Sequence, residues 1–326
     1  METTELADKI ARGDRRALAR AITLVESARP DHRAQAAEVL AALDTTRQAL
    51  RIGLSGTPGV GKSTFIESFG LMLTGQGKRV AVLAVDPSSA RSGGSILGDK
   101  TRMEQLSRDP NAFIRPSPSQ SQLGGVARRT REAIALCEGA GFDVVLIETV
   151  GVGQSETAVA EMSDLFLLLL APAGGDELQG VKRGIMETCD MILVNKADGE
   201  LRPQAIRTCS DYAGALRLLR RRSQDPEGFP KALTVSAFET GGIEAAWAEM
   251  RALAQWRRDT GVWDERRAGQ ALFWFREEVR AGLLAALEDD PAIAALLEDL
   301  QTRVARGELL PALAADQLVQ RFWGKG

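Results

Sequence analysis

Cysteine and histidine are scarce in this chain of 326 residues, which contains three cysteines and one histidine. Cys137, Cys189 and Cys209 are scattered without a C-x-x-C pair, and His32 stands alone. A disulfide framework and a cysteine–histidine zinc site both need several such residues at short spacings. The sequence supports neither, and each cysteine is expected to act as a small buried apolar residue.

Long apolar runs and an excess of one charge are also absent. The longest apolar run, residues 165–171, is far too short to span a bilayer, and residues 1–5 lack the basic and apolar regions of a signal peptide. The formal net charge is -3 with both signs interspersed, so no basic face is offered to a nucleic acid. We therefore expect a cytoplasmic protein with a protein or small-molecule partner, and neither a nucleic acid nor a membrane.

What the sequence does contain is a glycine-rich phosphate-binding pattern, G-x-x-x-x-G-K-[ST]. It is matched at every fixed position by Gly56-Thr57-Pro58-Gly59-Val60-Gly61-Lys62-Ser63, which Thr64 follows. A strand pattern precedes this loop at 51–55 and a helical pattern follows it, which is the required order. We predict that loop N–H groups bind phosphate oxygens, that Lys62 reaches the β- and γ-phosphates, and that the Ser63 hydroxyl holds Mg²⁺.

Apolar runs of strand length recur along the chain, mostly with helical patterns between them. Their alternation predicts an α/β protein with the P-loop NTPase fold: a doubly wound, mostly parallel sheet with ligands at the carboxyl ends of its strands. The segment 88–125 is expected to be a long loop that is partly helical around 100–106. The predicted strands are 51–55, 79–85, 143–147, 165–170, 191–194 and 232–235.

Helical patterns flank this nucleotide-binding core. We expect a helical N-terminal extension at 1–48, the nucleotide-binding domain at 49–258 and a helical C-terminal extension at 259–326. Four amphipathic helical faces follow the last strand, and four of the five tryptophans lie at or beyond Trp256. This aromatic surface is expected either to pack on the main domain or to form a homodimer interface.

A second chemical motif, Asn195-Lys196-Ala197-Asp198, directly follows the strand 191–194. A carboxylate at Asp198 can accept from both N1–H and the exocyclic amine of guanine, whereas adenine presents the wrong donors and acceptors. We predict that Asn195, Lys196 and Asp198 select guanine, a discrimination that can reach roughly 10⁴-fold. Ser236-Ala237, after the last strand, is expected to face the base through its backbone.

Carboxylates at strand ends are the candidate metal-binding residues. Glu148 ends the third long strand and is the first candidate for holding Mg²⁺ beside Ser63; Asp86 is the second. Asp99 lies in the long segment and would approach only when that segment closes. Each of the three carboxylates could instead cap a helix or a turn.

The sequence also predicts slow hydrolysis. Val152 stands where many GTPases carry a glutamine that orients water. Gln154 could take that role after a rearrangement, and Lys182 is a candidate for stabilising charge during phosphoryl transfer. The glycine-rich, charged loop 171–180 is predicted to be a third switch segment.

With these motifs, the chain resembles the MeaB/ArgK family of G proteins, bacterial relatives of the human methylmalonic aciduria type A protein, over nearly its whole length. The resemblance implies a GTP-hydrolysing chaperone that binds adenosylcobalamin-dependent methylmalonyl-CoA mutase or a related acyl-CoA mutase, gates cofactor loading and protects the enzyme from inactivation. The segments that carry it are 56–63, 81–89, 93–103, 113–119, 148–156, 175–182 and 195–198.

The same resemblance implies further site roles. Asp86, Asp99 and Glu148 would form the Mg²⁺ neighbourhood, and 175–182 would relay the nucleotide state to the mutase through Lys182. The family resemblance also implies a homodimer joined through helical extensions.

Two related classes of nucleotide-hydrolysing protein fit this sequence less well. Thr57 stands where signature-lysine ATPases carry lysine, and the cysteine or histidine clusters usual in nickel-handling GTPases are missing from the sequence. Two alternatives stay open. One is a nucleoside-triphosphate-dependent protein kinase linked to amino-acid transport, although no phosphoacceptor motif is visible. The other is a nucleotide-sensing scaffold whose turnover is incidental.

Overall fold

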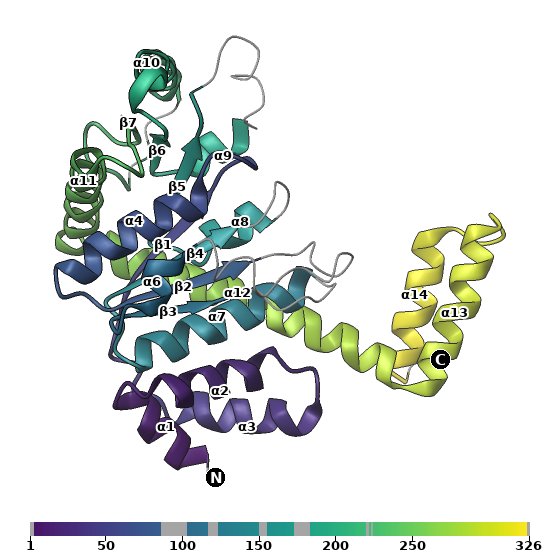
Figure 1. Ribbon diagram of the computed structural model, residues 1–326. Helices are drawn as coiled ribbons and strands as arrows, with labels where there is room; N and C mark the ends of the chain where they lie inside the picture. The colour runs from purple at the N-terminus through teal and green to yellow at the C-terminus, as the bar shows by residue number, and fades with distance from the viewer. Residues whose placement is uncertain are drawn as a thin grey trace. The chain divides into compact units, whose positions relative to one another are not determined.

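A computed structural model describes residues 3–85, 103–116, 123–149, 155–172, 183–219, 222 and 224–324 (Figure 1). In this described part, a seven-stranded sheet has the order β3-β2-β4-β1-β5-β6-β7, and every neighbouring pair is parallel. The strands are β1 (Leu50–Ser55), β2 (Val80–Val85), β3 (Ala112–Arg115), β4 (Val144–Thr149), β5 (Leu165–Leu170), β6 (Met191–Val194) and β7 (Lys231–Thr234).

Helices cover both faces of the sheet. One face packs against α4 (Lys62–Gly75), α6 (Glu104–Arg108) and α11 (Thr240–Asp259), whose apolar side chains share a core cluster with alternate strand residues. The other face contacts α7 (Leu123–Gly139), α8 (Ser155–Ala160) and α9 (Arg183–Thr188). β2, β4 and β5 are buried along their whole length, as expected for strands covered on both faces. The doubly wound fold is confirmed.

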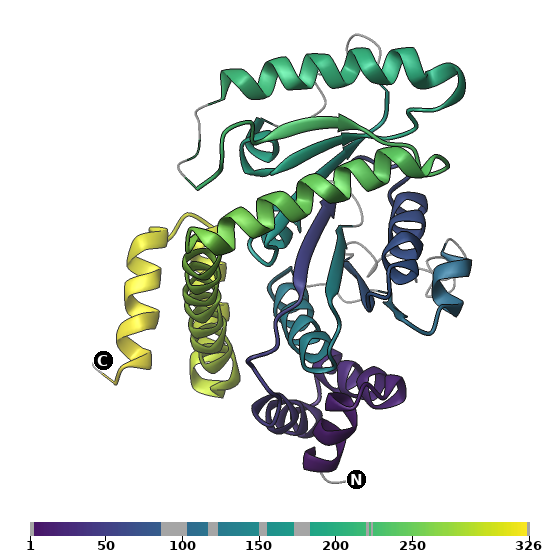
Figure 2. The same ribbon diagram turned by 90° about the vertical axis from the view of Figure 1, so that its left-hand side faces the viewer.

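The two outer edges of the sheet carry different helices (Figures 1 and 2). Beyond β7 lies α10 (Arg202–Leu218), which the short helix η2 (Gly199–Leu201) precedes. Near β3, the helices α1 (Thr3–Ala11), α2 (Arg15–Glu26) and α3 (Pro30–Ala41) pack on one another and on α7. Across the described residues, no helix is both long enough and apolar enough to cross a bilayer.

The expectation of a long loop at 88–125 was wrong in one respect, because the seventh strand lies inside it. β3 runs from Ala112 to Arg115, and only Ala112, Phe113 and Ile114 are apolar, so it lacks the longer apolar run that marks most of the other strands. It is fixed by its pairing with β2, in which Val80 faces Ala112 and Leu83 faces Arg115. The expected helix in the same segment is α6.

The chain divides into two compact units, Met1–Arg267 and Ala268–Gly326. The first contains the sheet, α1 to α11 and the start of α12 (Val262–Asp289). The second contains the rest of α12, α13 (Pro291–Ala305) and α14 (Pro311–Phe322). The four helical patterns expected after the last strand correspond to α11 to α14. The functional division into 1–48, 49–258 and 259–326 stays a prediction.

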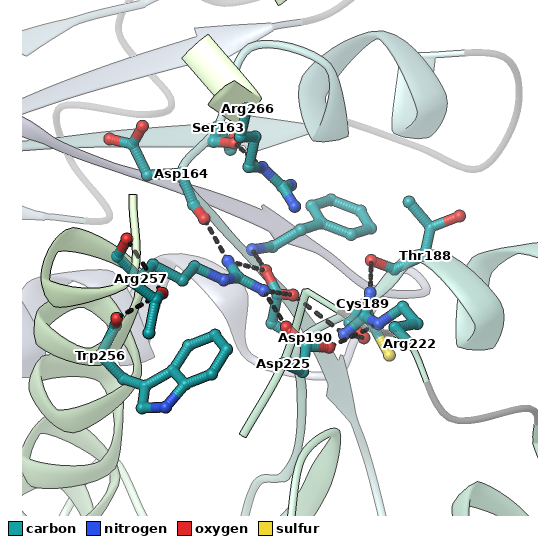
Figure 3. A network of polar contacts seen from close by, with 12 residues as sticks. Ser163, Asp164, Thr188, Cys189, Asp190, Arg222, Asp225, Trp256, Arg257 and Arg266 are labelled. Carbon is teal, nitrogen blue, oxygen red and sulfur yellow. Dashed lines mark hydrogen bonds and ion pairs between the residues drawn. The ribbon is translucent and has the colours of Figure 1, made fainter. Parts of the chain in front are cut away.

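A buried ion network lies at the amino end of β6 (Figure 3). Arg257 of α11 is fully buried, and its Nη2 donates to Oδ1 of Asp190 and Oδ1 of Asp225, each at 2.6 Å. Arg222 pairs with the same two carboxylates at 3.0 Å and 2.6 Å. Asp190 Oδ2 accepts from the Phe166 N–H at 2.8 Å, so the network ties α11 and the loop at 222–225 to β5 and β6.

The charge balance of this network favours ionised carboxylates. Burial by itself raises the pKa of Asp190, but Arg257, Arg266 and Arg222 outweigh burial and lower that pKa to about 2. Asp190 therefore stays charged under any physiological condition. A carboxylate held in this way stabilises the folded chain only while its cations are in place.

We expect Arg257→Met to lower the free energy of unfolding by about 3–5 kcal/mol, because it leaves two buried carboxylates without their main partner. The measurement is urea unfolding of the full chain at neutral pH. Arg207→Met, a change at an exposed arginine of α10, is the matched control and should stay within about 0.5 kcal/mol of the original. Equal unfolding midpoints for the two variants would contradict the stabilising role of Arg257.

The pH dependence gives a second check on the same pair. The pKa of Asp190 in the folded chain lies below its value of about 3.9 in the unfolded chain. Ionised Asp190 therefore adds to the free energy of unfolding above about pH 4, and this addition is lost as the pH falls towards 2. The stability difference between the Arg257→Met variant and the original should shrink over that window.

Candidate functional site

The phosphate loop, residues 56–61, connects the carboxyl end of β1 to the first turn of α4, and its backbone explains the two glycines that the motif fixes. Gly61 has a φ of 87°, and a Cβ there would lie 2.9 Å from Asn195 Nδ2. A Cβ on Gly56 would lie 2.4 Å from the carbonyl oxygen of Leu169 in β5. The left-handed conformation and these close approaches explain why the motif fixes glycine at these positions.

Lys62 reaches back over this loop. Its Nζ donates to the carbonyl oxygens of Gly56 at 2.6 Å and Thr57 at 3.4 Å. Burial lowers the pKa of Lys62, while the charges of Glu148 and Glu156 oppose that effect. A partly desolvated ammonium whose acceptors are neutral carbonyls gains more from a charged phosphate oxygen. The position of Lys62 therefore suits the predicted contact with phosphates.

Ser63 and Glu148 come together at the start of α4. The Ser63 hydroxyl donates to Glu148 Oε1 at 3.5 Å, and Glu148, on β4, is 5% exposed. Mg²⁺ prefers hard oxygen ligands such as hydroxyl and carboxylate groups. Ser63 and Glu148 bring one of each close together, so these two residues fit the ion. Among the described residues there is no cluster of three or more histidine, cysteine or acidic residues that could hold a metal.

The motif after β6 donates hydrogen bonds to the phosphate loop. Asn195 Nδ2 donates to the carbonyl oxygens of Val60 at 2.9 Å and Gly61 at 3.4 Å. Lys196 Nζ donates to the Gly59 carbonyl at 2.8 Å. Asn195 Oδ1 is buried and has no hydrogen-bond partner in the described part of the chain. A buried acceptor without a donor is costly, so it marks a place that a bound ligand can complete.

Asp198 and Ser236 join the loops that follow β6 and β7. The Ser236 hydroxyl donates to Asp198 Oδ2 in a short hydrogen bond and accepts from the Phe238 N–H at 3.1 Å. The Ala237 carbonyl accepts from the Ser68 hydroxyl of α4 at 2.6 Å. The structure therefore brings together the two parts of the predicted base site, which lie 38 residues apart in sequence.

Two residues of this site were missed by the sequence reasoning. Phe238 directly follows Ser236-Ala237 and is 80% exposed, so its ring is open to stacking by a planar base. Glu156, in the first turn of α8, is 4% exposed and accepts from the Ser55 hydroxyl at 3.3 Å. The position of Phe238 after the Ser-Ala pair was a usable signal. Glu156 lies within the motif 148–156, but its nearness to Lys62 depends on the fold.

The remaining site predictions lie outside the described residues. They are Asp86 and Asp99 as metal-binding residues, Gln154 and Lys182 as catalytic residues, and the switch at 175–182. These roles stay predictions.

Comparisons with known proteins agree with this geometry. A family model described as "Methylmalonyl Co-A mutase-associated GTPase MeaB" matches residues 18–292. A "Putative GTPase" of Caulobacter vibrioides is 52% identical over 323 residues, which cover 99% of this chain and 98% of that protein. The "Methylmalonic aciduria type A homolog, mitochondrial" of Mus musculus is 49% identical over 324 residues, covering 96% of this chain and 78% of the relative.

A solved structure shows the same fold. The crystal structure of a "LAO/AO transport system kinase" superimposes with a TM-score of 0.77 at 36% identity, and covers 98% of this chain and 97% of that chain. The matched ranges include the phosphate loop, the strand-end carboxylate Glu148 and both parts of the base site. Sequence and fold therefore point to one class of nucleotide-binding protein.

We expect Asp198→Asn to move the preference from guanine towards xanthine nucleotides. Xanthine carries a carbonyl where guanine carries its amino group, and an asparagine amide can donate to that carbonyl. The measurement is the Kd of GDP and of its xanthine counterpart, xanthosine diphosphate (XDP), by competition with a fluorescent nucleotide. An unchanged preference for GDP would contradict the prediction that Asp198 selects guanine.

Phe238→Ala provides the matched contrast at the same site. Stacking is worth about 1–3 kcal/mol per base and does not depend on base identity, so this variant should lose affinity for GDP and XDP equally. The ratio of the two affinities should stay that of the original chain. A change in the ratio would mean that Phe238 selects the base instead of stacking on it.

Proposed function

Because this chain belongs to the MeaB family of P-loop GTPases and is related to the methylmalonic aciduria type A homologs, we propose that it is a G-protein chaperone of a cobalamin enzyme. Its partner is adenosylcobalamin-dependent methylmalonyl-CoA mutase or a related acyl-CoA mutase, whose cofactor loading it gates and whose inactivation it prevents. The match of residues 18–292 to a family described as mutase-associated supports this choice. It works in the cytoplasm.

In this proposal, the chain binds GTP and GDP through Lys62, the phosphate loop and Asp198. Phosphate oxygens replace the carbonyls of Gly56 and Thr57 as the acceptors of Lys62, and the loop N–H groups turn towards them. Asp198 accepts from the guanine edge while it keeps its bond from Ser236, because an ionised carboxylate has two oxygen atoms that can each accept more than one hydrogen bond. The buried Ser236 hydroxyl therefore stays paired when the nucleotide binds.

Ser63 and Glu148 would hold a Mg²⁺ ion, with Asp86 and Asp99 as the further proposed carboxylates. The ion, when bound, neutralises charge on the phosphate groups. Because Glu148 already accepts from Ser63, the two oxygen atoms are held close before the ion arrives. Glu156 behind them keeps negative charge near Lys62.

Intrinsic hydrolysis is slow, because Val152 has no group that can orient a water molecule. We propose that Gln154 supplies that group after a rearrangement of its segment. Lys182, in the switch at 175–182, couples the nucleotide state to the mutase. Turnover by this chain therefore depends on its partner.

We expect purified methylmalonyl-CoA mutase to stimulate GTP turnover by this chain at least tenfold, with no effect on ATP. The measurement is release of phosphate at saturating GTP, with and without the mutase, and with ATP as the nucleotide control. Slow GTP turnover that the mutase does not change would contradict this partner, while leaving the GTPase activity in place.

The same assay separates two other functions. The name of the related transport system kinase favours a kinase, which would transfer the γ-phosphate of labelled GTP to a protein; we expect the label only in free phosphate. A nucleotide-independent scaffold would keep full protection of the mutase in the Lys62→Ala variant. We expect that variant to lose GTP binding and protection together.

We also propose that the chain is a homodimer joined through residues 259–326. α12 carries a row of exposed apolar side chains in the second unit: Leu272 is 58% exposed, Phe275 65%, Val279 45% and Leu283 48%. Their spacings of three and four residues place them on one face of the helix, over a length of about 17 Å. Monomeric proteins rarely expose a continuous apolar row, and a second copy would cover it.

Replacing Phe275 and Val279 together by glutamate should convert the dimer to a monomer at micromolar concentration, because two charges would be buried in an apolar interface. Sedimentation velocity measures the outcome. Gln301→Glu, at an exposed polar position of α13, is the control and should stay dimeric. GDP affinity should be the same in all three proteins, so a loss of folding would be recognised. Dimers in both variants would refute this interface.

A further inference from the structure

A cavity of about 570 Å³ opens at the amino ends of the central strands. Leu50 and Val144, the first residues of β1 and β4, form its floor, and α11 forms one wall. The phosphate loop leaves the opposite end of β1, so the length of a six-residue strand, roughly 20 Å, separates the two places. Its volume lies within the range of roughly 300–1,000 Å³ that is usual for small-molecule sites.

The charged groups that line this cavity are unbalanced. Lys78, Arg251 and Arg258 are its cations, and Asp143 is its one carboxylate. Asp143 is already engaged, because its Oδ2 accepts from the Arg79 N–H at 2.7 Å. None of the three cations has a carboxylate within ion-pair distance in the described residues. The cavity therefore has an excess of positive charge that the chain does not neutralise.

Three other arginines at this end of the sheet are paired. Arg51 binds Glu138 at 2.7 Å, Arg267 binds Asp164 at 2.7 Å, and Arg257 binds its two aspartates. Arg257 lies on the same helix as the two arginines of the cavity, yet it has carboxylate partners and they do not. Arg257 is buried, whereas Arg251 and Arg258 are exposed, so the two cavity arginines are open to an anion from outside the chain.

The two arginines are held against aromatic rings instead. The Arg251 guanidinium carbon lies 5.7 Å from the centroid of the Trp247 ring, and that of Arg258 lies 4.1 Å from the Trp263 ring. A cation–π contact holds a guanidinium near the ring while its N–H groups keep their capacity to donate. Both arginine side chains are exposed, so these N–H groups are open to a ligand in the cavity.

Uncharged donors add to this set. Trp263 Nε1 donates to Gln48 Oε1 at 3.0 Å, which uses the acceptor of that amide and leaves its NH₂ group to donate. Trp247 also lines the cavity, but its Nε1 is buried away from solvent and does not add to these donors. The groups around the cavity thus offer donors in excess of acceptors.

The spacing of the arginines defines the shape of the ligand. Arg251 and Arg258 are seven residues apart on α11, which corresponds to about 10 Å along the helix. Ala252 and Ala254, which also line the cavity, lie between them and take up little space. We propose that this cavity is a second binding site, for an elongated small molecule with anionic groups, phosphoryl or carboxylate, at both ends.

The test uses the full chain saturated with GDP and Mg²⁺, so that the phosphate loop is occupied and cannot bind the probe. Fructose bisphosphate and azelate are the phosphoryl and carboxylate probes that span this length, and inorganic phosphate is the short control. Binding is followed by the indole N–H signals in a nitrogen-15 NMR spectrum, which variants with phenylalanine at each tryptophan assign.

We expect one or both long probes to shift the signals of Trp247 and Trp263 saturably, with the Trp323 signal unchanged. Whichever probe binds identifies the end groups. Replacing Arg251 and Arg258 by glutamine should weaken this binding at least tenfold, whereas Arg207→Gln, on α10, should leave it unchanged. GDP affinity should be equal in all three proteins, which shows that they are folded and separates this site from the nucleotide site.

Three results would overturn the proposal. One is the absence of any saturable shift with either long probe. Another is equal binding by the double variant and the original chain. The third is binding of inorganic phosphate as tight as that of the long probes, which would show an adventitious ion only.

Discussion

The hydrogen bonds from Asn195 to the carbonyl oxygens of Val60 and Gly61 hold the phosphate loop against the end of β6, and the candidate site depends on them. Without a side chain on Gly61, the loop backbone comes close enough for these bonds to form. They use two loop carbonyls as acceptors, while Lys62 donates to two others, those of Gly56 and Thr57. The residue that starts the base motif therefore also shapes the phosphate site.

The two ends of the sheet differ in how their polar side chains are paired. At the amino ends, Arg257 and Asp190 neutralise each other's charge inside the protein. At the carboxyl ends, Lys62 donates to neutral carbonyls, Asn195 Oδ1 lacks a donor among the described residues, and Phe238 is exposed. Parallel strands place all their carboxyl ends on one edge, so unsatisfied groups collect there. The cavity beside α11 is an exception to this division.

Much of this could be predicted from the sequence. Six of the strands were expected, because parallel strands that are buried on both faces appear as apolar runs; β7 was among the six, although it is only partly buried. The strand β3 was missed, since its four residues depend on pairing with β2 and not on their own pattern. Two motifs at strand ends placed Asp198 and the Ser236-Ala237 backbone at one base site, but the hydrogen bond from the Ser236 hydroxyl to Asp198 was not expected. The role of Glu156 was not, because no local pattern places a helix residue beside Lys62.

The sequence by itself determined the local chemistry: the glycine spacing of residues 56–61, the order of strand, loop and helix, and the side chains of the motif at 195–198. Such features are encoded by neighbouring residues, through backbone conformation and the donors that each side chain carries. Only the tertiary structure decided which strand ends lie together, that Ser63 donates to Glu148 at 3.5 Å, and that Arg251 and Arg258 line a cavity without carboxylate partners among the described residues. Contacts between distant residues follow from the order of strands in the sheet, and hydrophobic periodicity along the chain carries no record of that order.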